Sequence, residues 1–267
     1  MSNRPLILVT NDDGIAAPGL RVLTELAVTL GEVIVVAPDS PRSGQGHAIT
    51  LETPLRLREV NVFDDLPVLA YECNGTPVDC VKLAKHHVAK GRRIDFCVSG
   101  INHGANYGIN VLYSGTMSAA MEASLEGTPS IGFSLLDYSW EADFDHARRP
   151  VRDLLEHGLQ QGLGQARLLN VNIPAASESG IAGVRICRQA EARWVEEFQQ
   201  GKDPQGRPYF WLTGNFVLGE DMDGTDVEAL EQGYISVVPT HHDLTLYPAM
   251  ESLKKLEQLS AQPLNRS

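Results

Sequence analysis

The amino-acid sequence predicts an α/β fold built on a mostly parallel β-sheet. Three short runs, at residues 6–9, 33–37 and 94–98, are almost continuously apolar rather than alternating, which is typical of strands buried on both faces. Between the first two runs, apolar residues recur at helical spacing from Leu20 to Leu30, which completes a strand-helix-strand unit with a right-handed crossover. The 267 residues, 43% of them hydrophobic and 21% charged, suit one α/β core carrying an extension.

The first strand ends abruptly in Asn11-Asp12-Asp13-Gly14. In an open α/β sheet, ligands bind beyond the carboxyl ends of the strands, so Asp12 and Asp13 are expected at such a crevice. Two adjacent carboxylates are costly to desolvate without a partner, and a cation is the simplest partner. Taken alone, the tetrapeptide fits a turn that starts a helix equally well.

The other elements of the core follow from the same patterns. Strands are predicted at residues 33–38, 68–73, 94–99, 130–135 and 168–174, with a hairpin of short strands at 49–58. Helices are predicted at residues 20–30, 77–88, 117–125 and 144–159. The second helix has Thr76 as its N-cap and Pro77 at its first position.

The hydrophobic pattern changes beyond Pro174, which predicts a core of residues 1–182 and an extension of residues 183–267 that partly packs back on it. The extension is expected to contain strands at 184–187 and 209–213 joined through a polar segment with a turn at 203–207, then a short helix capped by Thr225, a strand at 234–238 and a terminal helix at 249–259.

Large aromatic residues concentrate in the extension, at Trp194, Phe198, Tyr209, Phe210 and Trp211. So many large aromatics outside the main core suggest a hairpin arm that packs on another subunit. The alternative is a β-rich flap over the same core.

The net charge of -12 argues against binding of a nucleic-acid polymer, because an anionic surface repels a phosphate backbone. No stretch approaches the roughly 20 apolar residues that span a membrane, and Met1 to Pro5 lead straight into a strand without the apolar region of a signal peptide. We therefore expect a cytoplasmic protein. The four cysteines lack the spacing of a zinc site and are interpreted as small core residues.

Polar loops follow three of the parallel strands and converge on one edge of the predicted sheet. They carry four oxygen donors, Asp12, Asp13, Ser43 and Asn102. Two carboxylates, a hydroxyl and an amide oxygen suit a hard divalent cation such as Mg²⁺ or Mn²⁺. Beside it, Asn106 and the turn Ser114-Gly115-Thr116, at the start of a helix, could hold the oxygens of a phosphate.

Several common phosphate and hydrolase motifs are excluded. The chain has no G-x-x-x-x-G-K-[ST], no G-x-G-x-x-G after the first strand and no G-x-S-x-G elbow. A phosphatase of the haloacid dehalogenase type would need D-x-D, whereas Asp12 and Asp13 are adjacent.

A series of motifs in fixed order resembles the survival protein SurE family and covers nearly the whole chain. These motifs are Val9 to Gly14, Ala37-Pro38-Asp39 with Arg42-Ser43-Gly44, Gly75-Thr76-Pro77 with Asp79-Cys80-Val81, Ser99 to Asn102 with Gly104 and Asn106, Tyr113 to Thr116, Gly224-Thr225-Asp226, Ala229-Leu230, and Gly233-Tyr234 with Ser236. One departure is residues 238–243, where many relatives have Thr-Pro-Leu, and it leaves the C-terminal contacts open.

The resemblance implies a metal-dependent 5'/3'-nucleotidase acting on nucleoside monophosphates, with short polyphosphate as a further substrate in some members. It implies a Rossmann-like, three-layer core with an extended β-hairpin and a C-terminal segment used in dimer or tetramer assembly. It places the ligands of one divalent cation per subunit at Asp12, Asp13, Ser43 and Asn102, and phosphate contacts at Asn106, Ser114, Gly115 and Thr116.

The mechanism that we expect is in-line attack on phosphorus by a water molecule, with Asp13 as the base. The alternative is attack by an aspartate to form an aspartyl-phosphate. A non-catalytic sensor of nucleotide or metal is the alternative of another class. His47 and His103 are left out of the catalytic set, because a loop histidine is often only solvated, and Arg42 could face either phosphate or an acidic residue.

Overall fold

The computed structural model describes residues 4–261, so residues 1–3 of the predicted core and 262–267 of the predicted C-terminal segment lie outside the described residues. The strands are β1 (Leu6–Thr10), β2 (Glu32–Pro38), β3 (Leu57–Glu59), β4 (Val68–Cys73), β5 (Phe96–His103), β6 (Ser130–Leu135), β7 (Leu168–Ile173), β8 (Gly183–Ile186), β9 (Ala192–Lys202), β10 (Pro208–Leu218) and β11 (Tyr234–Thr240). The helices are α1 (Pro18–Leu30), α2 (Pro77–Leu83), α3 (Gly115–Leu125), α4 (Asp145–Gln161), α5 (Asp226–Glu231) and α6 (Tyr247–Leu253). Shorter helical turns are η1 (Ala84–Val88), η2 (Gly108–Leu112) and η3 (Lys254–Ala261).

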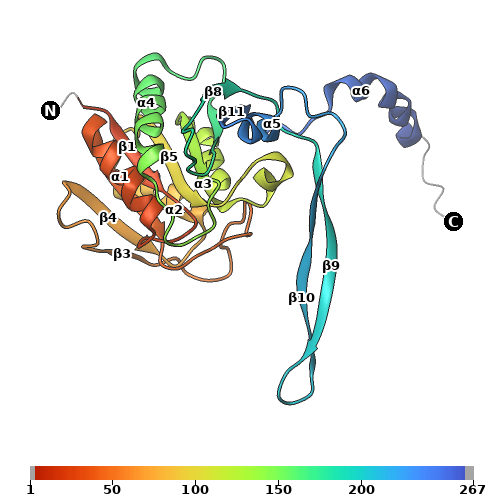
Figure 1. The fold of residues 1–267 in the computed structure, drawn as a ribbon, viewed down its shortest axis with the longest axis horizontal. Coiled ribbons are helices and arrows are strands. Elements are labelled where there is room, and N and C mark those ends of the chain that lie inside the picture. Colours follow the sequence, from red (N-terminus) through yellow and green to blue (C-terminus); the bar gives the residue numbers. More distant parts are fainter. Residues whose placement is uncertain (1–3, 262–267) are drawn as a thin grey trace.

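A nine-stranded sheet with helices on both faces forms the body of the molecule, in the order β3-β4-β2-β1-β5-β6-β7-β11-β8 (Figure 1). The neighbouring strands from β4 to β7 run parallel, whereas β3 and β11 pair antiparallel with their inner neighbours. The predicted α/β class and Rossmann-like three-layer core are confirmed.

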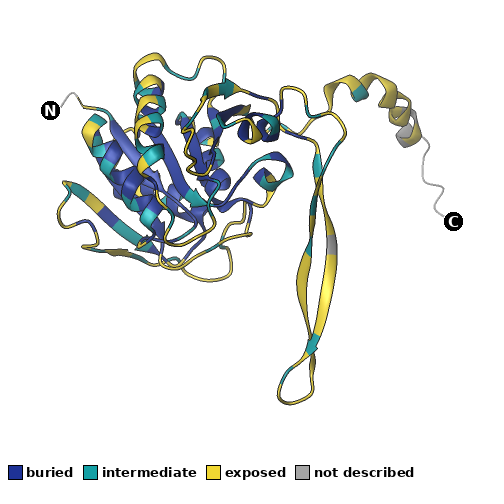
Figure 2. Ribbon diagram, viewed as in Figure 1, coloured by how far each residue is buried: buried dark blue, intermediate teal, exposed yellow. Residues whose placement is uncertain are grey.

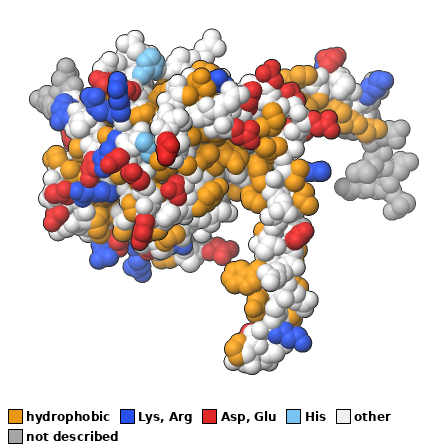
Figure 3. Space-filling model, in the orientation of Figure 1, with side chains coloured by type: hydrophobic (Ala, Val, Ile, Leu, Met, Phe, Trp, Pro, Cys, Tyr) orange, Lys and Arg blue, Asp and Glu red, His pale blue; other side chains and the backbone are white. Residues whose placement is uncertain are grey.

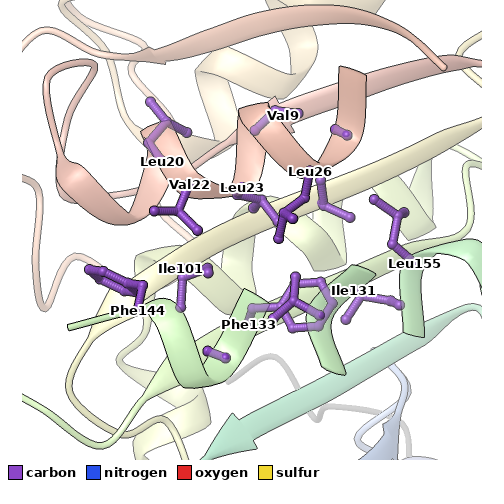
Figure 4. Packing of buried hydrophobic residues seen from close by; sticks show 14 of the residues in the cluster. Val9, Leu20, Val22, Leu23, Leu26, Ile101, Ile131, Phe133, Phe144 and Leu155 are labelled. Atoms are coloured by element: carbon purple, nitrogen blue, oxygen red, sulfur yellow. The ribbon is translucent and has the colours of Figure 1, made fainter. Parts of the chain in front are cut away.

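Side chains of the central strands point alternately into two hydrophobic clusters, one on each face of the sheet. Ile7 and Val9 of β1 join the cluster under α1 and α4, which Figure 4 shows with Leu23 and Leu155 packed over the sheet. Leu6 and Leu8 of the same strand join the opposite cluster, under α2 and α3. Burial on both faces, visible as the dark interior of Figure 2, explains why these strands are apolar without alternation.

The strand order reverses between β1 and β5. From β1 the chain proceeds outward through β2 and β4, and from β5 it proceeds in the other direction through β6 and β7. At such a switch point the loops diverge and leave a crevice beyond the carboxyl ends of the two strands. The N-terminus of α1 closes one side tightly, because a Cβ at Gly19 would lie 2.0 Å from the carbonyl oxygen of Ile101.

Two predicted elements of the core differ from the structure. Residues 49–56 form no strand, and only β3 remains of the predicted hairpin, because side chains hold this segment: Thr50 N–H donates to Asp79 and Arg56 N–H to Asn74. The strand predicted at residues 94–99 runs instead to His103, through a register shift against β6 between Ser99 and Asn102.

The extension contains a long antiparallel arm, β9 and β10, that leaves the body (Figure 1). The predicted turn at residues 203–207 closes it, and the strand predicted at 209–213 lies within β10. The other predicted strand, at 184–187, corresponds to β8 in the main sheet, and β9 takes the place of the predicted polar connection. A two-stranded arm exposed on both faces does not need hydrophobic alternation, so the polar sequence of β9 does not by itself predict a strand. Because the arm points away from the body, it is not a flap over the core.

The helices predicted within the core are confirmed, and the N-caps Thr76 and Thr225 each accept a hydrogen bond from a backbone N–H of the first turn. The predicted terminal helix is α6 followed by the 3-10 turn η3. Within residues 4–261, no helix combines the length and the apolar composition needed to cross a membrane.

Asp226, which is fully buried, ties the foot of the arm to the body. Its carboxylate accepts hydrogen bonds from the backbone N–H groups of Gly108, Ala190 and Val227 at 2.9–3.0 Å. Burial is the largest influence on this group and raises its pKa.

We predict that Asp226→Ala lowers the free energy of unfolding by about 3 kcal/mol, because it leaves three buried donors without acceptors. Asp226→Asn should lower the free energy of unfolding by less, since its amide oxygen still accepts some of these hydrogen bonds. Urea unfolding followed by circular dichroism measures both. Equal stability of wild type and Asp226→Ala would contradict this role.

Candidate functional site

The loop after β1 is shaped by Asn11. Its side-chain amide donates to the carbonyl of Gly14 at 3.0 Å, and its amide oxygen accepts from the N–H of Gly14 at 3.2 Å. Gly14 has φ +99°, a conformation that favours glycine. The loop is therefore held tightly enough to leave Asp12 and Asp13 side by side at the switch point.

Asp12 brings three distant segments together. The hydroxyl of Thr116, in the first turn of α3, donates to its Oδ1, and its backbone carbonyl accepts from Arg42 N–H at 2.8 Å. The approach of α3 requires a glycine: a Cβ at Gly115 would lie 2.6 Å from the Cβ of Asp12. Asp12 is only 4% exposed as a result.

The two carboxylates lack a positive partner from Lys or Arg within the described residues. Burial, and then the charge of Asp13, raise the pKa of Asp12 to about 6. Negative charge confined in this way favours a bound cation. The donor set is chemically suitable for Mg²⁺ or Mn²⁺, although residues 4–261 hold no group of three or more His, Cys, Asp or Glu side chains placed for a metal.

Asp13 and Asn102 are joined through His103. The backbone N–H and ring Nδ1 of His103 lie 3.3 and 3.1 Å from Asp13 Oδ2. The His103 ring stacks on Trp140 and meets Phe144 edge-on, each with centroids 5.3 Å apart. Asn102 donates through its Nδ2 to the carbonyl of Gly104 at 2.8 Å, which leaves its Oδ1 available to a ligand.

Ser43 lies in the loop that follows β2, which two hydrogen bonds hold against the site. Arg42 N–H binds the Asp12 carbonyl, and Gly46 N–H binds the Tyr113 carbonyl at 3.1 Å. Ser43 itself is exposed, and its hydroxyl has no hydrogen bond within residues 4–261. The Arg42 guanidinium turns away, toward Asp39 at 3.2 Å, so the acidic alternative for Arg42 is the one seen.

The predicted phosphate contacts occupy two different settings. Ser114 caps α3 by accepting from Met117 N–H at 3.0 Å, next to Gly115 and Thr116. Asn106, in the loop after β5, is bound to β6, because its Nδ2 donates to the hydroxyl of Ser134 at 2.8 Å. No hydrogen bond connects Asn106 with any of the four predicted metal ligands in the described part of the chain.

Sequence reasoning missed the residues that support this set. Asn170 and Asn172 of β7 hold the backbone of Asn106, the first by donating to its carbonyl and the second by accepting from its N–H, each at 2.8 Å. Two asparagines inside an apolar strand were the available signal. His47 Nε2 lies 2.9 Å from the buried Glu122 and anchors the loop of Ser43, a contact without any sequence signal.

The chain is similar in sequence and in structure to known proteins of one family. The profile of the family described as survival protein SurE matches residues 7–196. The 5'-nucleotidase SurE of Cytophaga hutchinsonii is 54% identical over 253 residues, covering 95% of this chain and 97% of its own. That of Christiangramia forsetii is 54% identical over 250 residues, covering 94% and 96%. The crystal structure of the SurE protein from Aquifex aeolicus matches with a TM-score of 0.80 and 37% identity, over 95% of this chain and all of that one.

The raised pKa of Asp12 predicts how the stability of the metal-free protein changes with pH. A carboxyl whose folded-state pKa is about 6 rather than 3.8 destabilises the metal-free fold progressively as pH rises from about 4 to about 6. We therefore predict that, in EDTA at pH 7.5, Asp12→Asn is more stable than wild type by on the order of 1–3 kcal/mol. The difference should nearly vanish at pH 4.

Thermal unfolding at both pH values tests this, with the exposed Asp64→Asn as control. A less stable Asp12→Asn at pH 7.5 would show that the carboxylate is compensated by groups of the protein.

Proposed function

The chain belongs to the survival protein SurE family, and we propose that it is a nucleotidase that uses one divalent cation per subunit, Mg²⁺ or Mn²⁺. Its proposed substrates are nucleoside 5'- and 3'-monophosphates, with short polyphosphate as a further substrate. The observation that carries the proposal is the pair of a buried Asp12 and a partly buried Asp13, without a Lys or Arg partner in residues 4–261, at the switch point of the sheet. The relatives named 5'-nucleotidase support the 5' activity.

We propose that the cation is held by Asp12, Asp13, Ser43 and Asn102. Asp12 and Asp13 supply charge, and the free Oδ1 of Asn102 and the exposed hydroxyl of Ser43 supply neutral donors. When bound, such an ion polarises a phosphoryl oxygen and lowers the pKa of a coordinated water.

The phosphate is proposed to lie at the start of α3, with Asn106 contributing from the neighbouring loop. Thr116 N–H already binds the Asp12 carboxylate and Met117 N–H is capped by Ser114, so the eleven-residue helix offers a phosphate the backbone N–H of Gly115 and the positive end of its dipole. Ser114 fixes the end of the helix by its cap. These donors suit the charge that develops on phosphoryl oxygens during transfer.

Asp13 is the proposed base in the attack by water. Its Oδ2 is engaged by His103, which leaves Oδ1 to accept a proton from the attacking water. The packing of His103 between Trp140 and Phe144 restrains the carboxylate in this orientation. His103 is thereby a positioning residue for Asp13.

Phosphate release from a panel of nucleoside 5'- and 3'-monophosphates tests the proposed activity. We expect release with Mg²⁺ or Mn²⁺ and loss of release in EDTA, restored by adding the metal back, because the carboxylates alone repel the anionic substrate. Tight nucleotide binding without release under any metal would instead identify a sensor.

Asp12→Asn and Asp13→Asn should each lower kcat/KM at least about a hundredfold, because each removes charge that holds the cation. Circular dichroism checks that the fold is intact. Acid quenching with radiolabelled substrate should trap no phosphoenzyme. A trapped aspartyl-phosphate, or normal turnover of either variant at saturating Mn²⁺, would refute the corresponding role.

We further propose a homodimer or homotetramer, supported by the exposed aromatics of the arm, such as Phe198 and Trp211. A cytoplasmic location, and the absence of nucleic-acid and membrane partners, are proposed from the sequence alone. The division into a core of residues 1–182 and an extension of residues 183–267 is also retained as a proposal, with β8 and β11 of the extension paired into the main sheet.

A further inference from the structure

We propose that a hollow between the foot of the arm and the loop of Ser43 binds the base of the substrate nucleotide by stacking. The hollow has a volume of about 480 Å³. Its lining comes from three segments: Gly44 of the loop after β2, Asn110 and Tyr113 around η2, and Trp194 with residues 212–214 of the arm. The inference rests on the proposed nucleotidase function and names the part of the substrate that this surface recognises.

The hollow begins where the proposed metal and phosphate site ends. Gly44 directly follows Ser43, and Tyr113 directly precedes Ser114. The hydrogen bond from Gly46 N–H to the Tyr113 carbonyl, 3.1 Å long, holds these two segments side by side. A phosphate at the start of α3 therefore has the hollow next to it, and the nucleoside of a bound nucleotide can extend into it.

A hydrogen bond and an aromatic contact hold the Trp194 ring in place. Its indole N–H donates to Asn110 Oδ1 at 2.9 Å, and its ring packs edge-on against Phe216 with centroids 5.3 Å apart. Phe216 in turn packs against Tyr107 at 5.6 Å. Trp194 nevertheless remains 43% exposed, so a ring fixed on one side offers free surface on the other.

Tyr113 provides the second ring of the hollow and is 52% exposed. The lining is mostly apolar, and because Asn110 uses its Oδ1 for Trp194, only its Nδ2 is left to bind a base. Stacking on aromatic rings tolerates any base, because every base has a π-face. We therefore expect broad base tolerance, with purines favoured by their larger face.

Hydrogen bonds at the foot of the arm fix the two walls of the hollow relative to each other. Asp226 binds both Gly108, at the start of η2, and Ala190, just before β9, so the two walls of the hollow share one buried anchor. Figure 3 shows hydrophobic side chains continuing from the body onto the arm at this junction. The foot of the arm thus belongs to the substrate site, whatever its outer part contacts.

The test compares a nucleotide with the same phosphate ester lacking a base. We expect Trp194→Ala to lower the ratio of kcat/KM for adenosine 5'-monophosphate to that for ribose 5-phosphate about tenfold, mainly through KM. Trp194→Phe should recover most of the ratio, since it keeps an aromatic face. Val195→Ala, next to Trp194 on the same strand, equally exposed but outside the lining, is the matched control and should keep the wild-type ratio.

Binding of adenosine, measured by calorimetry in EDTA, separates this inference from the proposed function. A wild type that hydrolyses neither ester refutes the nucleotidase, while adenosine binding weakened about tenfold by Trp194→Ala still supports the base site. An unchanged ratio in Trp194→Ala, or no saturable adenosine binding to wild type, overturns the base site. A change of oligomeric state with an unchanged ratio, seen by light scattering, would assign the hollow to a contact between copies of this chain.

Discussion

The confinement of two adjacent carboxylates at the end of β1 is the constraint on which the site depends. Asp12 is buried by the close approach of α3, which only a glycine at 115 permits, and this burial, followed by the charge of Asp13 beside it, raises its pKa. Such an arrangement is unfavourable for the isolated chain. The hydrogen bonds from Thr116 and His103 therefore hold a geometry that a bound cation would complete.

The parallel sheet makes this confinement possible. Because the strand order reverses between β1 and β5, the loops after these strands diverge and leave room beyond their carboxyl ends. The residues proposed to bind metal and phosphate sit mostly on rigid supports: Asn102 at the end of β5, Thr116 in the first turn of α3, and Asp12 in a loop closed by Asn11. Ser43 alone lies in an exposed loop, anchored by its neighbours.

The arm is fixed to the body at its foot and exposed along its outer part. Its foot is fixed to the body by Asp226 and by the bond between Trp194 and Asn110, whereas its outer part exposes large aromatics such as Phe198 and Trp211. Exposed aromatics on an extended ribbon are typical of a contact surface. If the foot lines the substrate site, assembly through the outer part would also steady that lining.

The sequence by itself determined the α/β class, the parallel strands and the polar loops at their ends, because burial on both faces leaves uninterrupted apolar runs that read directly from the chain. It also pointed to Asp12 and Asp13, which alone fit a turn equally well, because polar loops after two other strands carry the further oxygen donors Ser43 and Asn102. Only the tertiary structure decided how the site is supported. His103 on Asp13, Asn172 under Asn106 and the course of β9 depend on contacts between residues far apart in the chain, for which local periodicity carries no signal.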